Sequence, residues 1–178
     1  MKKHCCWLLL LISLASLCSC SMVDSRLNML NTDSDEEKAD ARMAQVIDAI
    51  KDQDKDAIKA IFSKQALSET NDIDAGINYL FNLVKGDIKL WEKDTVGSYE
   101  DIEYGKKDIL IFSFYTVTTD VGVYKFFLLD HSINTIDPNN AGLYSLRAIK
   151  SKDEKTQFTF WEDMQIPGIF IPKTNSSK

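Results

Sequence analysis

The chain has 178 residues, with 21 Lys and Arg against 27 Asp and Glu, so its formal net charge at pH 7 is −6. Nucleic-acid binding calls for a basic face, and this acidic balance therefore disfavours DNA and RNA as partners. All four cysteines lie within the first 20 residues, which excludes disulfides and cysteine metal sites from the remainder of the chain.

The first 19 residues have the pattern of a secretory signal peptide. A short basic start, residues 1–4, precedes a leucine-rich apolar run over residues 7–17. That run is shorter than the roughly 20 apolar residues that a membrane-spanning helix needs. It closes on Leu-Cys-Ser-Cys, residues 17–20, which resembles the bacterial lipobox, where the thiol of the final cysteine accepts a diacylglyceryl group.

Cleavage before Cys20 would leave that cysteine as the lipid attachment site. It would also remove Lys2 and Lys3, which takes the net charge from −6 to −8. Two or more acyl chains, such as palmitate, suffice for stable anchoring. We therefore expect a lipoprotein on the extracytoplasmic face of the cell membrane. The alternative is an ordinary signal peptide cut near Ser19 or Ser21, in which Cys20 has no role.

The chain after the signal divides into three parts by composition. Residues 20–34 are polar and predict a tether between the lipid and the domain. Residues 35–172 have the length and apolar content of one compact domain. Residues 173–178 are polar and predict a loose tail.

Three helices are predicted at the start of this domain. Apolar residues with helical spacing over residues 43–50 follow an acidic start at residues 35–37. Asp54 is expected to cap a second, short helix, and Asn71 or Asp72 to cap a third.

After Gly86, which suits the left-handed backbone at a helix end, the apolar period changes to two. This period predicts strands, expected at residues 88–92, 102–104, 109–118, 123–133, 143–150 and 157–161. Helices followed by a meander of strands predict an α+β fold, with the helices on one face of an antiparallel sheet.

Four stretches carry a resemblance to a known family: residues 50–63, 115–120, 142–147 and 167–172. In these stretches the chain resembles a family of Firmicutes lipoproteins described only as a domain of unknown function. It also resembles the nuclear-transport-factor-2-like (cystatin-like) superfold. The resemblance implies three N-terminal helices packed on a curved antiparallel sheet that forms a cone. It implies no activity, because that superfold hosts isomerases, dehydratases, protein-binding adaptors and immunity proteins.

The interior of such a cone is the expected place for a ligand site. Aromatic residues at alternate strand positions, and one on the third helix, are expected to line it: Tyr79, Trp91, Phe112, Phe114, Phe126, Phe127 and Tyr144. Large aromatics in such positions more often form plain core, so core and pocket both remain open interpretations.

His131 is the one histidine left after cleavage. A lone histidine makes no multi-histidine metal site, and without a cysteine or a placed serine motif it makes no triad. Its neighbour Asp130 should point to the opposite face of the strand. An isomerase would need a carboxylate base and a group that polarises a carbonyl, for which Asp130, Tyr104 and Tyr115 are the residues to test. No catalytic set, metal site or cofactor is predicted.

Three functions remain open. The first is a non-enzymatic binding or interaction module, held to the membrane by lipid on Cys20 and binding a small apolar ligand or a protein. The second is an isomerase- or dehydratase-like enzyme, which requires a buried carboxylate of raised pKa facing the cone pocket. The third is an immunity or inhibitor lipoprotein, which requires a clustered acidic patch.

Overall fold

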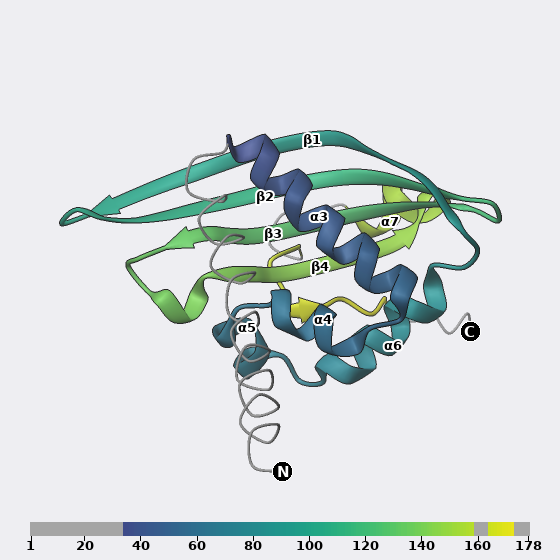
Figure 1. The fold of residues 1–178 in the computed structure, drawn as a ribbon, viewed down its shortest axis with the longest axis horizontal. Coiled ribbons are helices and arrows are strands. Elements are labelled where there is room, and N and C mark those ends of the chain that lie inside the picture. Colours follow the sequence, from purple (N-terminus) through teal and green to yellow (C-terminus); the bar gives the residue numbers. More distant parts are fainter. Residues whose placement is uncertain (1–33, 159–163, 173–178) are drawn as a thin grey trace, which may run out of the picture. The chain divides into compact units, whose positions relative to one another are not determined.

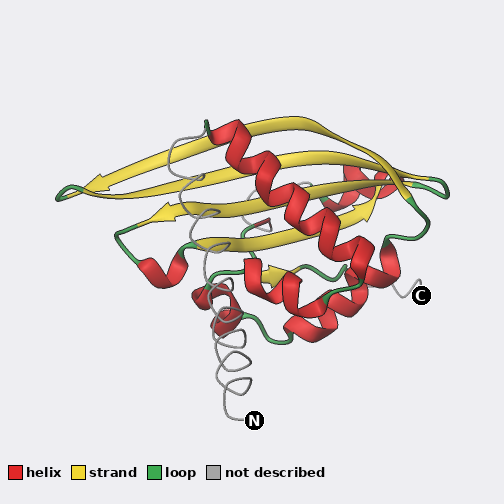
Figure 2. Cartoon of the chain, viewed as in Figure 1, coloured by secondary structure: helices red, strands yellow, loops and turns green. Residues whose placement is uncertain are grey.

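The computed structural model describes residues 34–158 and 164–172 (Figures 1 and 2). The predicted signal peptide, the lipid site Cys20, the tether up to Asp33 and the tail from Lys173 lie outside the described residues. Within the described ranges, no helix combines the length and the apolar character needed to cross a membrane.

The first helix begins with a pair of reciprocal hydrogen bonds. In α3 (Asp35–Asp52), the Ser34 hydroxyl accepts from the Glu37 N–H at 3.3 Å, and the Glu37 carboxylate accepts from the Ser34 N–H at 2.8 Å. This capping box satisfies two donors at the helix start. The acidic residues 35–37 lie in the first turn, which confirms the predicted helix start.

Four helices, rather than the three predicted, precede the sheet in the described part of the chain. Asp54 caps α4 (Lys55–Ile61) as predicted, but a further helix, α5 (Lys64–Glu69), follows with Ser63 as its cap. Six residues are too few to show a helical period, so the sequence pattern missed α5.

Asp72 caps the last of these helices, α6 (Ile73–Leu83), as one of the two predicted alternatives. Gly86 has the left-handed backbone expected of it, with φ of 80°. It does not end the helix, because α6 already closes at Val84 in an extended conformation.

The first strand corrects the sequence prediction. Residues 88–92 and 102–103 belong to one strand, β1 (Ile88–Glu103), which pairs antiparallel with β2 (Lys106–Thr119), and residue 104 lies in the turn between them. Irregular register near Lys89 and Asp94, together with polar residues and Gly97, interrupts the apolar alternation and hides the continuity of the strand.

The remaining strands are β3 (Val123–Asn134), β4 (Gly142–Lys150) and the short β5 (Gly168–Ile169). Short 3-10 helices η1 (Pro138–Asn140) and η2 (Ser151–Asp153) flank β4. The strand predicted over 157–161 is not found at its start, because Gln157 ends α7 (Glu154–Gln157), and residues 159–161 lie outside the described residues.

The sheet order is β1-β2-β3-β4-β5, antiparallel except for the parallel β4–β5 pair. The fold is therefore mixed α+β, as predicted. The sheet is uncurled, with β1 and β5 as its two edges, and the predicted cone is not confirmed.

The main core lies between the helices and one face of the sheet. Figure 1 shows α3 running diagonally across the strands, and it contacts β1, β2 and β3. The predicted apolar face of α3 is fully buried there, against residues of β2, β3 and β4: Met43, Val46, Ile47, Ile50, Tyr115, Val117, Phe126, Leu128 and Leu146. A second cluster, on Phe127, Leu129 and Met164, lies on the other face.

Gly76 provides a test of how β5 docks on α6. A Cβ at Gly76 would lie 2.7 Å from the Cβ of Ile169 and 3.2 Å from its carbonyl oxygen. Alanine in place of glycine normally stabilises a helix by about 1 kcal/mol. We expect Gly76→Ala to destabilise instead, by about 1–3 kcal/mol, because the backbone of β5 must move.

Urea unfolding measures the change in the free energy of unfolding. Ala41→Gly, at an exposed position of α3, isolates the helix-propensity effect and should cost about 1 kcal/mol. A Gly76→Ala variant more stable than the wild type would show that β5 does not pack this closely.

Candidate functional site

The aromatic residues predicted to line one cavity lie on both faces of the sheet. Tyr115 and Phe126 are buried beneath the helices, with Trp91 and Tyr79 packed against the same cluster. Phe112, Phe114 and Phe127 belong to the cluster on the opposite face, where Phe158 packs beside them, and Tyr144 contacts both clusters. Strand alternation separates the two sets, so these aromatics surround no common pocket.

The three residues proposed for isomerase chemistry have separate environments. Tyr104 lies fully exposed in the β1–β2 turn with φ of 49°. The buried Tyr115 hydroxyl donates to Asp40 Oδ1 at 2.9 Å, and burial raises the pKa of Tyr115 above its ordinary value. Asp130 interacts with neither tyrosine in the described structure.

Asp130 is the buried carboxylate on which the enzyme hypothesis depends. It is 4% exposed, and its Oδ2 accepts from Arg42 Nε at 3.0 Å. Arg42 also donates to Gln45 at 2.8 Å. Asp130 Oδ1 has no hydrogen-bond partner among the described residues. The Asp130 carboxylate thus forms a buried ion pair with Arg42 of α3.

His131 uses both of its ring nitrogens. Nδ1 lies 2.8 and 2.9 Å from the two oxygens of Asp108, and Nε2 lies 3.1 Å from Asn140 Nδ2. With the Asn140 amide donating, Nε2 is the acceptor and Nδ1 donates to the carboxylate. Ser63 in turn donates to Asn140 Oδ1 at 3.4 Å. This chain of bonds ties β2, β3, η1 and the start of α5 together, which is a structural role.

Tyr144 lies near His131, with ring centroids 6.2 Å apart, and its hydroxyl donates to Glu69 Oε2 at 2.7 Å. Burial raises the pKa of Tyr144 to about 12. The same hydrogen bond lowers the pKa of Glu69. Asp130, His131 and Tyr144 lie near one end of the sheet, but each forms its hydrogen bonds with different partners.

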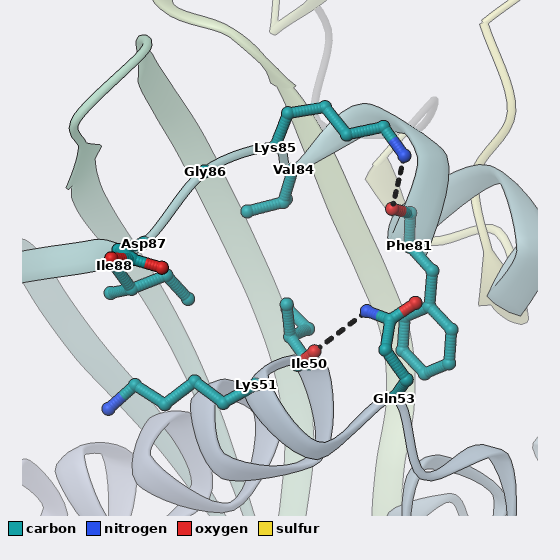
Figure 3. A pocket seen from close by; sticks show the side chains of 9 residues that line it. All are labelled: Ile50, Lys51, Gln53, Phe81, Val84, Lys85, Gly86, Asp87 and Ile88. Atoms are coloured by element: carbon teal, nitrogen blue, oxygen red, sulfur yellow. Dashed lines mark hydrogen bonds between the residues drawn. The ribbon is translucent and has the colours of Figure 1, made fainter.

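Two hollows lie near the other end of the sheet, beside the loop from α6 to β1. The first, which we call the loop hollow, has a volume of about 480 Å³ (Figure 3). Its lining residues are Ile50, Lys51, Gln53, Phe81, Val84, Lys85, Gly86, Asp87 and Ile88. Lys85 donates to the Phe81 carbonyl at 3.3 Å, and Gln53 donates to the Ile50 carbonyl at 2.8 Å. Both side chains thus satisfy helix-end carbonyls.

The second hollow, which we call the tyrosine hollow, has a volume of about 430 Å³. Its lining residues are Tyr79, Asn82, Leu83, Lys85, Val121, Tyr124 and Lys150. The Tyr79 hydroxyl donates to the Ala148 carbonyl at 3.1 Å. Burial, with a further contribution from the negative charge of Asp153, raises the pKa of Tyr79 to about 12.

Among the residues that line these two hollows, the sequence predicts only Tyr79 as a pocket residue. The others come from α3 and its C-cap, α6, the α6–β1 loop, β1, the β2–β3 turn, β3 and β4, and no spacing in the sequence joins them. Lysines beside a helix end and a turn are the one available signal, and such lysines are ordinary surface residues in most proteins.

Arg42 and Asp130 can be tested as a buried pair. Arg42→Met would leave the Asp130 carboxylate buried without its cation, which typically costs about 3–5 kcal/mol. The double variant Arg42→Met/Asp130→Leu removes both charges and should recover most of that loss. Urea unfolding measures each free energy. Lys59→Met, which removes the exposed ion pair with Asp74, should change stability little. Equal losses in the single and double variants would contradict this account.

Tyr79 predicts an alkaline effect on stability. Its pKa is about 12 in the folded protein against 10.0 ordinarily, so its contribution to stability is complete below pH 10 and is lost as the pH rises towards 12. Tyr79→Phe should therefore lose less stability than the wild type over this interval. In an ultraviolet titration of the native proteins, Tyr79→Phe should have one fewer phenol that ionises near pH 12 than the wild type. In denaturant, the variant should instead have one fewer phenol that ionises near pH 10. If native Tyr79→Phe instead lacked a phenol that ionises near pH 10 in the native wild type, the burial of Tyr79 would be contradicted.

Comparison with known proteins places this geometry in a family. A family model described as a domain of unknown function, DUF5104, matches residues 45–151. The match begins within α3 and includes α4, α5, α6 and β1 to β4, so it covers most of the main core and both hollows. A search of curated proteins finds no match. Because the family model covers more than half of the chain, the protein belongs to the DUF5104 family.

Proposed function

We propose that the protein is an extracytoplasmic lipoprotein, anchored to the cell membrane by lipid on Cys20, whose folded domain is a non-enzymatic binding module. The lipobox-like residues 17–20 support the anchor, because they follow a basic start and a short apolar run in the order of a signal peptide. The capped start of α3 at Ser34 supports a domain that begins after a polar tether.

One observation favours binding over an isomerase or dehydratase. Asp87 is the only carboxylate that lines either hollow in the described structure, and its side chain is 81% exposed and paired with Lys89 at 3.1 Å. The buried carboxylate, Asp130, lines neither hollow and is held by Arg42. A general base for such chemistry would have to lie within reach of a bound substrate.

The immunity or inhibitor alternative has less support. Acidic residues at the start of α3 form local ion pairs: Asp35 with Lys38 at 3.2 Å, and Glu36 and Asp40 with Lys93 at 3.1 and 3.2 Å. A surface that captures a basic toxin would instead present unpaired acids together.

We further propose a relationship to the Firmicutes lipoproteins and the nuclear-transport-factor-2-like superfold that the sequence resembles. Helices gathered on one face of a mostly antiparallel sheet support it. If the relationship holds, the superfold must include members whose sheet is uncurled, as it is in this protein.

Replacement of the proposed lipid-bearing cysteine tests the anchor. In cells fed labelled palmitate, the wild-type protein should take up label and fractionate with membranes, whereas Cys20→Ser should take up none and leave the membrane. Cys18→Ser is the matched control and should keep both properties, because serine is common at that lipobox position. A Cys20→Ser protein that still matures and stays at the membrane would rule out lipid anchoring at this residue.

A further inference from the structure

The tyrosine hollow contains a buried donor without an acceptor. Tyr124 is 4% exposed, and its oxygen accepts the Lys85 N–H at 3.2 Å. Among the described residues, nothing accepts the hydrogen of the Tyr124 hydroxyl itself. Because Tyr124 lines the hollow, this hydrogen is available to an acceptor that enters it.

Two ammonium groups line the same hollow. Neither Lys85 nor Lys150 forms an ion pair with a described residue, and Lys85 Nζ reaches only neutral oxygens, of Phe81 at 3.3 Å and Asn82 at 3.4 Å. No carboxylate is among the lining residues. The Asp153 carboxylate acts on Tyr79 from outside the lining. Two ammonium groups in the lining against this one carboxylate make the hollow a local site for negative charge in a chain of net charge −6.

Apart from the amide of Asn82, the remaining walls are mainly apolar. Leu83 and Val121 line the hollow with the rings of Tyr79 and Tyr124, and the Val121 side chain is largely exposed. The volume of about 430 Å³ lies in the range of small-molecule sites. An inorganic anion alone would leave this apolar surface in contact with water.

We propose that the tyrosine hollow binds a small organic anion with an apolar body. The anionic oxygens accept from the Tyr124 hydroxyl and the ammonium groups of Lys85 and Lys150, and the apolar body lies against Leu83 and Val121. The proposal rests on the proposed function as a binding module and names its ligand class. The loop hollow shares Lys85 but includes Asp87, which would oppose an anion there.

Benzoate and its neutral analogue benzamide provide the probes. Calorimetric titration of the full chain in a zwitterionic detergent should show benzoate binding at least tenfold tighter than benzamide. Tyr124→Phe and Lys150→Met should each weaken benzoate binding about tenfold, because each removes a donor to a charged oxygen. The same substitutions outside the hollow, Tyr99→Phe and Lys64→Met, should leave affinity unchanged. Thermal unfolding verifies that every variant is folded.

Three results would overturn the inference: equal affinity for benzamide, unchanged benzoate affinity in both hollow variants, or inorganic phosphate binding as tightly as benzoate. The Cys20→Ser protein should bind benzoate like the wild type. Failure of lipid anchoring with retained benzoate binding would therefore reject the membrane proposal alone. Retained anchoring without benzoate binding would reject the ligand class alone.

Discussion

Burial of one face of α3 against the sheet is the constraint on which the rest of the domain depends. Met43 and Val46 are fully buried against a sheet face that includes Tyr115 and Phe126, also fully buried. Each such side chain contributes about 1.5–3 kcal/mol by leaving water. Because the helix crosses three strands, this contact fixes which face of each strand is core and directs alternate side chains to the opposite face.

The same packing decides what polar groups can do in the interior. The Tyr115 hydroxyl and the Asp130 carboxylate both lie on the helix-facing side, and each finds its partner on α3, in Asp40 and Arg42. Neither residue lines either of the two hollows, which lie beside the α6–β1 loop and the β2–β3 turn.

Local signals made much of the fold predictable. The helical spacing over residues 43–50 and the caps at Asp54 and Asp72 depend on neighbours in sequence, as does the alternation in β2, β3 and β4. The continuity of β1 depends instead on pairing with β2 across irregular register, and β5 depends on contact with β4 and α6. Two residues are too few to show an alternating pattern, and the register of β1 is set by its partner strand, so no local pattern could reveal either feature.

The candidate site depends on non-local contacts even more. The sequence predicts Tyr79 as a lining residue because it is an aromatic residue on the third helix, but the importance of Tyr124 follows from its hydrogen bonding. Its oxygen accepts a backbone N–H, whereas no described residue accepts its own hydrogen, and sequence spacing carries no information on either point. A ligand oxygen would accept this hydrogen where two lysines already favour negative charge.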